Sequence, residues 1–260
     1  MPYCDHPDYE ATLHLALELA DTARAIARRD FRTGLAVERK GDGTPVTRAD
    51  REIEEAMRAR IRQAFPRHGI RGEEYAPVAG DEFTWVLDPI DGTKSFVTGF
   101  PLFGSLIALL HHGRPVLGII EAPGTGDRWI GSEGRMTVCN GGAAEPSSCV
   151  RLAEATIYTT TPETFTPDEL AAYGRVSAAC NLRRYGGDCY IYGLVASGHC
   201  ELAIEARLKP HDYMALVPVV EGAGGRISDW QGRPLDLDSD GRVVAAANEA
   251  VWREALRLLA

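Results

Sequence analysis

Residues 85–93 read Trp-Val-Leu-Asp-Pro-Ile-Asp-Gly-Thr and carry the strongest signal in this 260-residue chain. The apolar start of the run predicts a buried strand over residues 84–87. At the carboxyl end of that strand, Asp88 and Asp91 stand on a turn bent by proline and glycine, with the carbonyl group of Ile90 between them. Oxygens of these kinds are the ligands that hard dications prefer. Asp-Pro and Asp-Gly pairs are also good turn formers, so the run alone predicts either a cation site or an ordinary turn.

The rest of the chain predicts an α/β protein. Upstream, apolar residues recur at helical spacing, at Leu13, Ala16, Leu17, Ala20 and Ala27 and again at Ile53, Met57, Ile61 and Ala64. Short β-rich runs at 84–87, 103–110, 115–121, 128–130 and 136–139 predict an antiparallel meander. Further on, strands at 156–160, 182–185, 201–205, 226–229 and 243–246 alternate with helices at 167–179, 189–197, 213–222 and 249–259. We therefore expect an N-terminal α+β lobe (residues 1–143) and a C-terminal α/β lobe (residues 144–260).

Composition and charge narrow the function. The 45% hydrophobic content is typical of a globular protein, and the net charge of −9 argues against a nucleic-acid or anionic-membrane partner, because either needs a basic face. Six cysteines without a C-x-x-C pair indicate reduced thiols in the cytoplasm. The acidic N-terminus is unlike a secretory signal, and no apolar stretch approaches the roughly 20 residues of a membrane-spanning helix. An anionic substrate would therefore need a bound cation beside it.

Three further acidic positions each have a structural alternative. Glu73 lies in the sequence Gly-Glu-Glu, and adjacent glutamates are typical of a solvated loop. Asp212 precedes a predicted helix and could be its N-cap. Thr47 and Asp50 have the spacing of a capping box at the start of the second helix. Each position taken alone therefore has a structural explanation that needs no catalytic or metal-binding role.

Taken together, these positions resemble the inositol monophosphatase-like family of metal-dependent phosphatases over nearly the whole chain. The resemblance lies in Gly-Glu-Glu at 72–74, in the run at 85–93 and in Glu-Gly-Ala-Gly-Gly at 221–225. It implies a layered αβαβα sandwich of the inositol monophosphatase and fructose-bisphosphatase type. The active site would then lie in a cleft between the two lobes.

The resemblance also implies the metal site and a homodimer. Two or three Mg²⁺ ions per subunit would be held by Glu73, Asp88, the Ile90 carbonyl, Asp91 and Asp212. Many members have a tryptophan before the last ligand, where this chain has His211. The ligand itself is kept, so we expect metal binding to survive this difference.

The remaining implied roles concern the phosphate and the attacking water. The backbone amides of Gly92 and Thr93 would face the phosphate at a helix N-terminus. Thr93, oriented by Asp50, would help Glu73 to deprotonate a metal-activated water. This agrees with the chemistry of the residues, since clustered carboxylates repel a phosphate until cations neutralise them.

Within the family, the sequence is most similar to the histidinol-phosphate phosphatases, in residues 91–96, 126–129, 185–190, 192–194 and 208–212. Histidinol phosphate carries an amine and an imidazole, and acidic groups beside the metals would suit them. Asp188 and Glu205 are the candidates. Alternatively, Asp188 caps the helix at 189–197 and Glu205 is a surface strand residue. The expected substrate contacts are Asp91, Gly92, Thr93, Asp188, Glu205 and Asp212.

Two other functions stay open at this point. A relative could act on inositol phosphates, other sugar phosphates or a nucleotide 3′-phosphate, and a catalytically silent binding protein could keep the same fold. A silent protein would be marked by a lost metal ligand, and none of the expected ligands is missing. The sequence therefore predicts an enzyme that hydrolyses a small phosphorylated metabolite.

Overall fold

The computed structural model describes residues 2–34, 36–39, 41, 43 and 45–260. Its larger sheet has seven strands in the order β3-β4-β5-β6-β7-β8-β9. These are β3 (Gly69–Gly72), β4 (Phe83–Asp91), β5 (Gly104–His111), β6 (Arg114–Ala122), β7 (Asp127–Ser132), β8 (Arg135–Cys139) and β9 (Gly142–Ala143). Strand β3 pairs parallel to β4, and every following pair is antiparallel. The predicted meander is confirmed.

The second sheet has five strands in the order β11-β10-β12-β14-β13. They are β10 (Thr156–Thr159), β11 (Leu182–Tyr185), β12 (Leu202–Glu205), β13 (Arg226–Ser228) and β14 (Val243–Ala246), alternating with α4 (Pro167–Ala179), α5 (Tyr190–Ala196), α6 (Pro210–Tyr213), α7 (Leu216–Ala223) and α8 (Glu249–Leu259). The single helix predicted at 213–222 is instead two short helices, α6 and α7. A small hairpin of β1 (Val37–Arg39) and β2 (Pro45–Thr47) precedes α2 (Arg48–Ala64).

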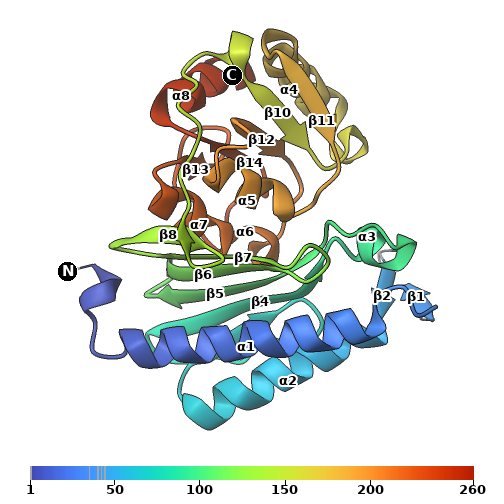
Figure 1. The fold of residues 1–260 in the computed structure, drawn as a ribbon, viewed down its shortest axis with the longest axis vertical. Coiled ribbons are helices and arrows are strands. Elements are labelled where there is room, and N and C mark those ends of the chain that lie inside the picture. Colours follow the sequence, from blue (N-terminus) through green and yellow to red (C-terminus); the bar gives the residue numbers. More distant parts are fainter. Residues whose placement is uncertain (1, 35, 40, 42, 44) are drawn as a thin grey trace.

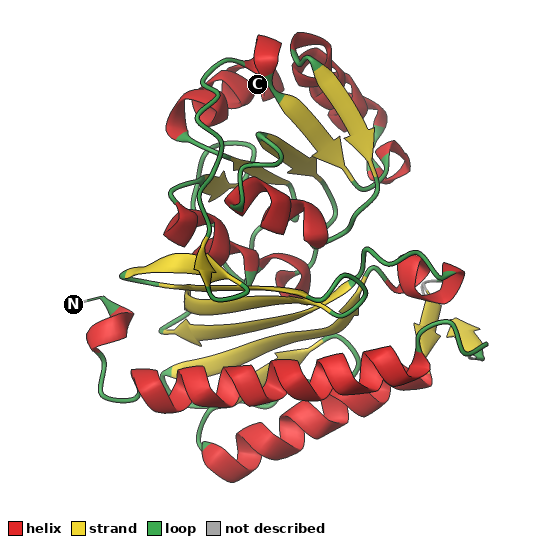
Figure 2. Ribbon diagram, in the orientation of Figure 1, coloured by secondary structure: helices red, strands yellow, loops and turns green. Residues whose placement is uncertain are grey.

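Helices and sheets alternate in five layers (Figure 1). Helices α1 (Tyr9–Asp30) and α2 lie on one face of the larger sheet, and α5 and α7 lie between the two sheets. Helices α4 and α8 cover the outer face of the smaller sheet, as the colouring by secondary structure also shows (Figure 2). This arrangement confirms the predicted αβαβα sandwich.

The alternation of strand side chains explains the layers. In β4, Trp85 and Leu87 enter the core under α1 and α2, whereas Val86 points to the opposite core. In β12, Ala203 faces the central core and Ile204 the core beneath α4 and α8. Each sheet is therefore apolar on both faces, as a sheet covered by helices on both sides must be.

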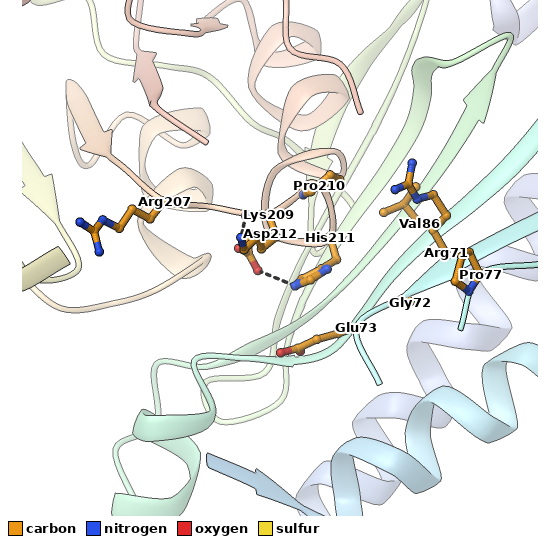
Figure 3. A pocket seen from close by; sticks show the side chains of 10 residues that line it. All are labelled: Arg71, Gly72, Glu73, Pro77, Val86, Arg207, Lys209, Pro210, His211 and Asp212. Carbon is orange, nitrogen blue, oxygen red and sulfur yellow. Dashed lines mark hydrogen bonds and ion pairs between the residues drawn. The ribbon is translucent and has the colours of Figure 1, made fainter. Parts of the chain in front are cut away.

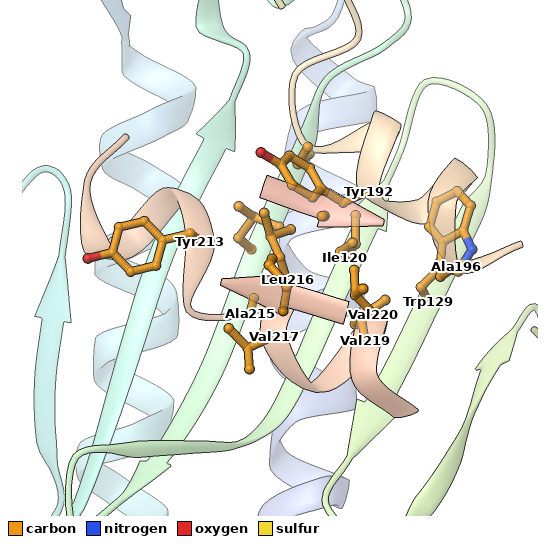
Figure 4. Close-up of a cluster of buried hydrophobic side chains, with 14 of the residues drawn as sticks. Ile120, Trp129, Tyr192, Ala196, Tyr213, Ala215, Leu216, Val217, Val219 and Val220 are labelled. Atoms are coloured by element: carbon orange, nitrogen blue, oxygen red, sulfur yellow. The ribbon is translucent and has the colours of Figure 1, made fainter. Parts of the chain in front are cut away.

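The central core joins the two halves of the chain. Helix α7 packs on β6, β7 and β8, and its side chains form one buried cluster with α5 and both sheets (Figure 4). The strands of the larger sheet all precede residue 144, and those of the smaller sheet follow it. The division into lobes at residues 143 and 144 stays a prediction. Among the described residues, no helix is both long and apolar enough to cross a membrane.

Candidate active site

An irregularity in strand β4 brings Asp88 and Asp91 to the same side of the sheet. The strand does not end at Leu87 as predicted but continues to Asp91. Asp88 pairs with Leu106 and Asp91 with Gly104, so three steps on β4 correspond to two on β5. In a regular strand, residues three apart point to opposite faces, and the extra residue of a bulge cancels this. Pro89 fits the bulge because it has no N–H to donate.

Asp212 completes the first carboxylate cluster. One oxygen from each of Asp88, Asp91 and Asp212 lies within 4.8 Å of the others. Asp212 comes from helix α6, where its Oδ2 accepts the backbone N–H of Lys209 at 2.6 Å. The suggested N-cap role is wrong, because Lys209 is the N-cap and Asp212 is the third residue of α6. Its carboxylate closes a capping box and also reaches the cluster. Asp91 Oδ2 accepts the backbone N–H of Cys189 at 2.5 Å, which ties this cluster to the start of α5.

The repulsion between the buried carboxylates of this cluster favours binding of a cation. Asp88 is 2% exposed, and its Oδ1 has no hydrogen-bond partner among the described residues. Burial, together with the charges of Glu73, Asp91 and Asp212, raises the pKa of Asp88 well above its usual value. Burial and the charges of Asp188 and Asp212 do the same to the pKa of Asp91. A dication would remove this repulsion and satisfy the unpartnered oxygen, so the residues fit a metal site.

Glu73 lies beside the same cluster. A second group of ligand atoms, from Glu73, Asp88 and His211, also falls within 4.8 Å. Glu73, His211 and Asp212 line a cavity of about 540 Å³ between the loop after β3 and helix α6 (Figure 3). Among the described residues, the acidic clusters beside Asp88 include Glu73 and not Glu74.

Asp50 contacts both the start of helix α2 and the Thr93 hydroxyl. Its Oδ2 accepts the backbone N–H of Thr47 at 2.8 Å and the Thr47 hydroxyl at 2.6 Å, so the predicted capping box is present. Its Oδ1 accepts from the Thr93 hydroxyl at 3.4 Å. Burial raises the pKa of Asp50, the bonds from Thr47 lower it and the charge of Glu73 raises it again. The contact with Thr93 links α2 to the start of α3 (Thr93–Thr98).

Asp188 lies against the turn that follows Asp91. Its Oδ2 accepts from the Ser95 hydroxyl at 2.7 Å, and the N-cap of α5 is Cys189, which makes no side-chain capping bond. A Cβ on Gly92 would meet the Asp188 carboxyl carbon at 2.7 Å, so only glycine, at φ 80°, allows this approach. Asp188 itself has φ 46°, a conformation that aspartate tolerates better than most residues. The suggested capping role for Asp188 is not what its carboxylate does here.

Glu205 is buried rather than a surface strand residue. It is 6% exposed and accepts the Thr160 backbone N–H at 2.9 Å and the Tyr192 hydroxyl at 3.0 Å. Burial raises the pKa of Glu205 to about 7, although the bonds from Thr160 and Tyr192 lower it. A small cavity is lined by Glu205 and Asp188 together with Asp91 and Asp212.

Comparison with known protein families identifies the family of this chain. Residues 8–260 match the model of the inositol monophosphatase family. The chain belongs to the inositol monophosphatase family. It is therefore a phosphatase of that family, and the enzymes of the family use Mg²⁺.

Relatives within the inositol monophosphatase family differ in the substrate that their names state. The chain is 45% identical over 251 residues to a bifunctional phosphatase, IMPL2, of Arabidopsis thaliana, covering 93% of this chain and 72% of the relative. It is 38% identical to a histidinol-phosphatase of Chlorobaculum parvum, covering 93% of both. A solved structure of an inositol monophosphatase from Zymomonas mobilis superimposes with a TM-score of 0.89 at 45% identity, covering 96% of this chain and 98% of the other. The comparison therefore leaves the substrate undecided.

The sequence analysis missed the buried support behind Glu73. Glu54 is fully buried, pairs with Arg58 Nε at 2.7 Å and accepts the backbone N–H of Glu74 at 2.7 Å. Arg58 donates to the carbonyl oxygens of Tyr75 and Ala76. This pair holds the segment that directly follows Glu73. Its sequence signal is a charged i, i+4 pair, which is common on solvated helix faces and so does not reveal burial.

Proposed function

We propose that this chain hydrolyses L-histidinol phosphate to L-histidinol and phosphate, a reaction of histidine biosynthesis. The observation that carries the proposal is the acidic cavity beside the metal site. Its lining combines the carboxylates of Asp91, Asp188, Glu205 and Asp212 with the hydroxyls of Thr160, Thr164 and Tyr192. Among the residues that the structure describes, no arginine or lysine lines this cavity. A substrate whose non-phosphate part is cationic gains most from such surroundings.

The two outer carboxylates suit two cationic groups. Asp188 would lie beside the phosphate group of the substrate, because it contacts Gly92 and Ser95 in the turn whose amides would bind that phosphate. Glu205 lies deeper, on β12, and Tyr192 and Thr160 hold its carboxylate in place. Burial raises the pKa of Asp188, and the hydrogen bond from Ser95 and the charge of Lys94 only partly offset this rise. The amine and imidazole of histidinol phosphate would meet these two groups.

The chemical steps use residues that the fold has already positioned. Bound Mg²⁺ would neutralise the phosphate, hold the leaving oxygen and lower the pKa of the attacking water. Glu73 would take the proton of that water, and Thr93, held by Asp50, would orient it. Asp88, Asp91, the Ile90 carbonyl and Asp212 would be the remaining ligands. The amides of Gly92 and Thr93 would bind the phosphate.

A second candidate function is inositol monophosphate hydrolysis. The likeness to the Zymomonas mobilis inositol monophosphatase favours it, since identity there is 45%. Buried carboxylates can also accept hydrogen bonds from the hydroxyls of a polyol. Charge is what separates the two substrates, because only histidinol phosphate places a cation against Asp188 and Glu205. The homodimer and the cytoplasmic location stay predictions from the resemblance and the sequence.

Kinetics on both substrates test the proposal. We expect wild-type kcat/KM to favour histidinol phosphate, and Asp188→Asn and Glu205→Gln each to lower it by about 10- to 100-fold, since a charged hydrogen bond contributes about 1.5 to 3 kcal/mol. Inositol 1-phosphate should change much less. Glu82→Gln is the matched control, because Glu82 precedes β4 at the end opposite Asp91. A wild-type preference for inositol 1-phosphate would refute the assignment, and equal losses on both substrates would make the two residues structural.

A further inference from the structure

His211 stands among the acidic residues in a position that the Mg²⁺ chemistry does not require. One of its ring nitrogens lies within 4.8 Å of a Glu73 oxygen and an Asp88 oxygen. The three residues come from separate parts of the fold, the loop after β3, strand β4 and helix α6. In Figure 3 the imidazole lies between Glu73 and Asp212 and faces the cavity. This places a nitrogen donor beside two carboxylates.

A second observation points to a ligand beside Asp88. Asp88 belongs to both acidic groups, and its buried Oδ1 has no hydrogen-bond partner. A buried carboxylate oxygen without a partner costs free energy unless a cation or a donor satisfies it. Another group, formed by Glu82, His111 and His112, also has metal-ligand spacing, but Glu82 and His112 are solvent-exposed. In the part of the chain that the structure describes, none of its three residues carries a buried unpartnered atom. Of these two groups, the one that contains His211 is therefore the better candidate for a metal site.

We propose that His211 is a metal ligand and that, with Glu73 and Asp88, it forms a position for a transition-metal dication. Mg²⁺ prefers oxygen ligands, whereas imidazole suits Fe²⁺, Ni²⁺ and Zn²⁺ better. The site would therefore bind one such ion more tightly than an all-oxygen site would. The residue is well placed for this role, because the Lys209–Asp212 bond fixes the start of α6 and the His211 side chain is 21% exposed.

The competing role for His211 is an ion pair. Its Nε2 lies 3.5 Å from Asp212 Oδ1, so a protonated imidazole could simply neutralise that carboxylate. In that role both nitrogens would carry protons and neither could bind a metal. The two roles of His211 thus differ in whether a ring nitrogen of His211 is coordinated to the metal ion. This difference can be measured without any substrate.

Electron spin-echo envelope modulation of bound Mn²⁺ makes the measurement. The full chain is stripped of metal, loaded with Mn²⁺ and compared with His211→Phe and with the matched control His112→Phe, which removes an imidazole from the exposed group. We expect ¹⁴N modulation typical of a coordinated imidazole in the wild type and the control, and its loss in His211→Phe. Absence of ¹⁴N modulation in the Mn²⁺-loaded wild type, or its persistence in His211→Phe, overturns the proposal.

Metal titration provides a second readout. In His211→Phe, one Zn²⁺ should bind about tenfold or more weakly, while Mg²⁺ affinity changes by less than about threefold. Equal weakening for both ions would assign His211 to the ion pair and refute the proposal. Thermal unfolding of the metal-free variant checks folding, and His211→Gln replaces it if Phe is not tolerated. Because no substrate is present, failure here leaves the histidinol phosphate proposal untouched.

Discussion

Replacing Asp50 with asparagine tests whether this carboxylate serves catalysis or only the start of helix α2. The two oxygens have separate partners. Oδ2 accepts from Thr47 at 2.8 Å and 2.6 Å, and Oδ1 accepts from the Thr93 hydroxyl at 3.4 Å. Asparagine has the same shape but only one acceptor oxygen, so it cannot serve both partners.

The two roles predict effects of different kinds. Loss of a cap costs about 1 kcal/mol, and for a chain of this size that lowers the melting temperature by about 2–4 °C. Loss of Oδ1 removes one of the two acceptors of the Thr93 hydroxyl, the other being the Ile90 carbonyl at 3.0 Å, and we expect kcat to fall about 100-fold or more. Such a fall corresponds to about 2.7 kcal/mol in the transition state. A small stability change with a large loss of activity is therefore the expected result for Asp50→Asn.

Two further variants separate the partners of Asp50. Thr47→Ala removes the hydroxyl that accepts the Ala49 N–H, so it damages the cap while leaving the Asp50–Thr93 contact. It should lower the melting temperature as Asp50→Asn does and keep activity within about twofold. Thr93→Val should lose as much activity as Asp50→Asn, and the double variant should lose no more than either single one.

The assays are phosphate release in saturating Mg²⁺ and thermal unfolding of the same preparations. Full activity in Asp50→Asn would show that Asp50 only caps helix α2 and has no role in catalysis. An equal loss of activity in Thr47→Ala would show that the position of helix α2, rather than the carboxylate, is what matters. Additive losses in the double variant would mean that Asp50 and Thr93 act separately.

Three other predictions concern the metal, its support and pH. A chelator should abolish activity and Mg²⁺ restore it, and full activity in excess chelator would refute the metal mechanism. Gly72→Ala should destabilise the fold by about 3 kcal/mol and weaken Mg²⁺ binding, because the new Cβ would lie 2.0 Å from Glu54 Oε1 and would displace the buried Glu54–Arg58 pair. Denaturant unfolding measures the stability and Mg²⁺ titration the affinity. Wild-type values in both assays would contradict the supporting role of the Glu54–Arg58 pair. Burial raises the pKa of Glu205 to about 7, so the folded state binds its proton more tightly than the unfolded state does. The protonated carboxyl therefore contributes its full stabilisation below about pH 4.5, and this stabilisation is lost as the pH rises through 7. Between these limits the free energy of unfolding of metal-free wild type should fall relative to Glu205→Gln by on the order of 3 kcal/mol, and parallel pH curves would exclude this titration.

The sequence alone determined the secondary structure where the signal is local. Helices α4 and α8 and strands β11 and β14 have the predicted bounds. Both helices begin at capping residues that lie next to their apolar faces in the sequence, Thr166 and Asn248. Spacing and caps act over a few residues, so they can be interpreted without knowing the rest of the fold. The run at 85–93 likewise predicted a strand that ends in carboxylates.

Only the tertiary structure decided how those carboxylates meet. The bulge at Asp88–Asp91 depends on pairing with β5, and Asp212 reaches the cluster from a helix more than 100 residues further along the chain. Burial of Glu205 beneath Tyr192 could not be seen from a strand whose exposure depends on its neighbours. Contacts of this kind arise from packing between distant segments, and periodicity within a segment carries no information about them.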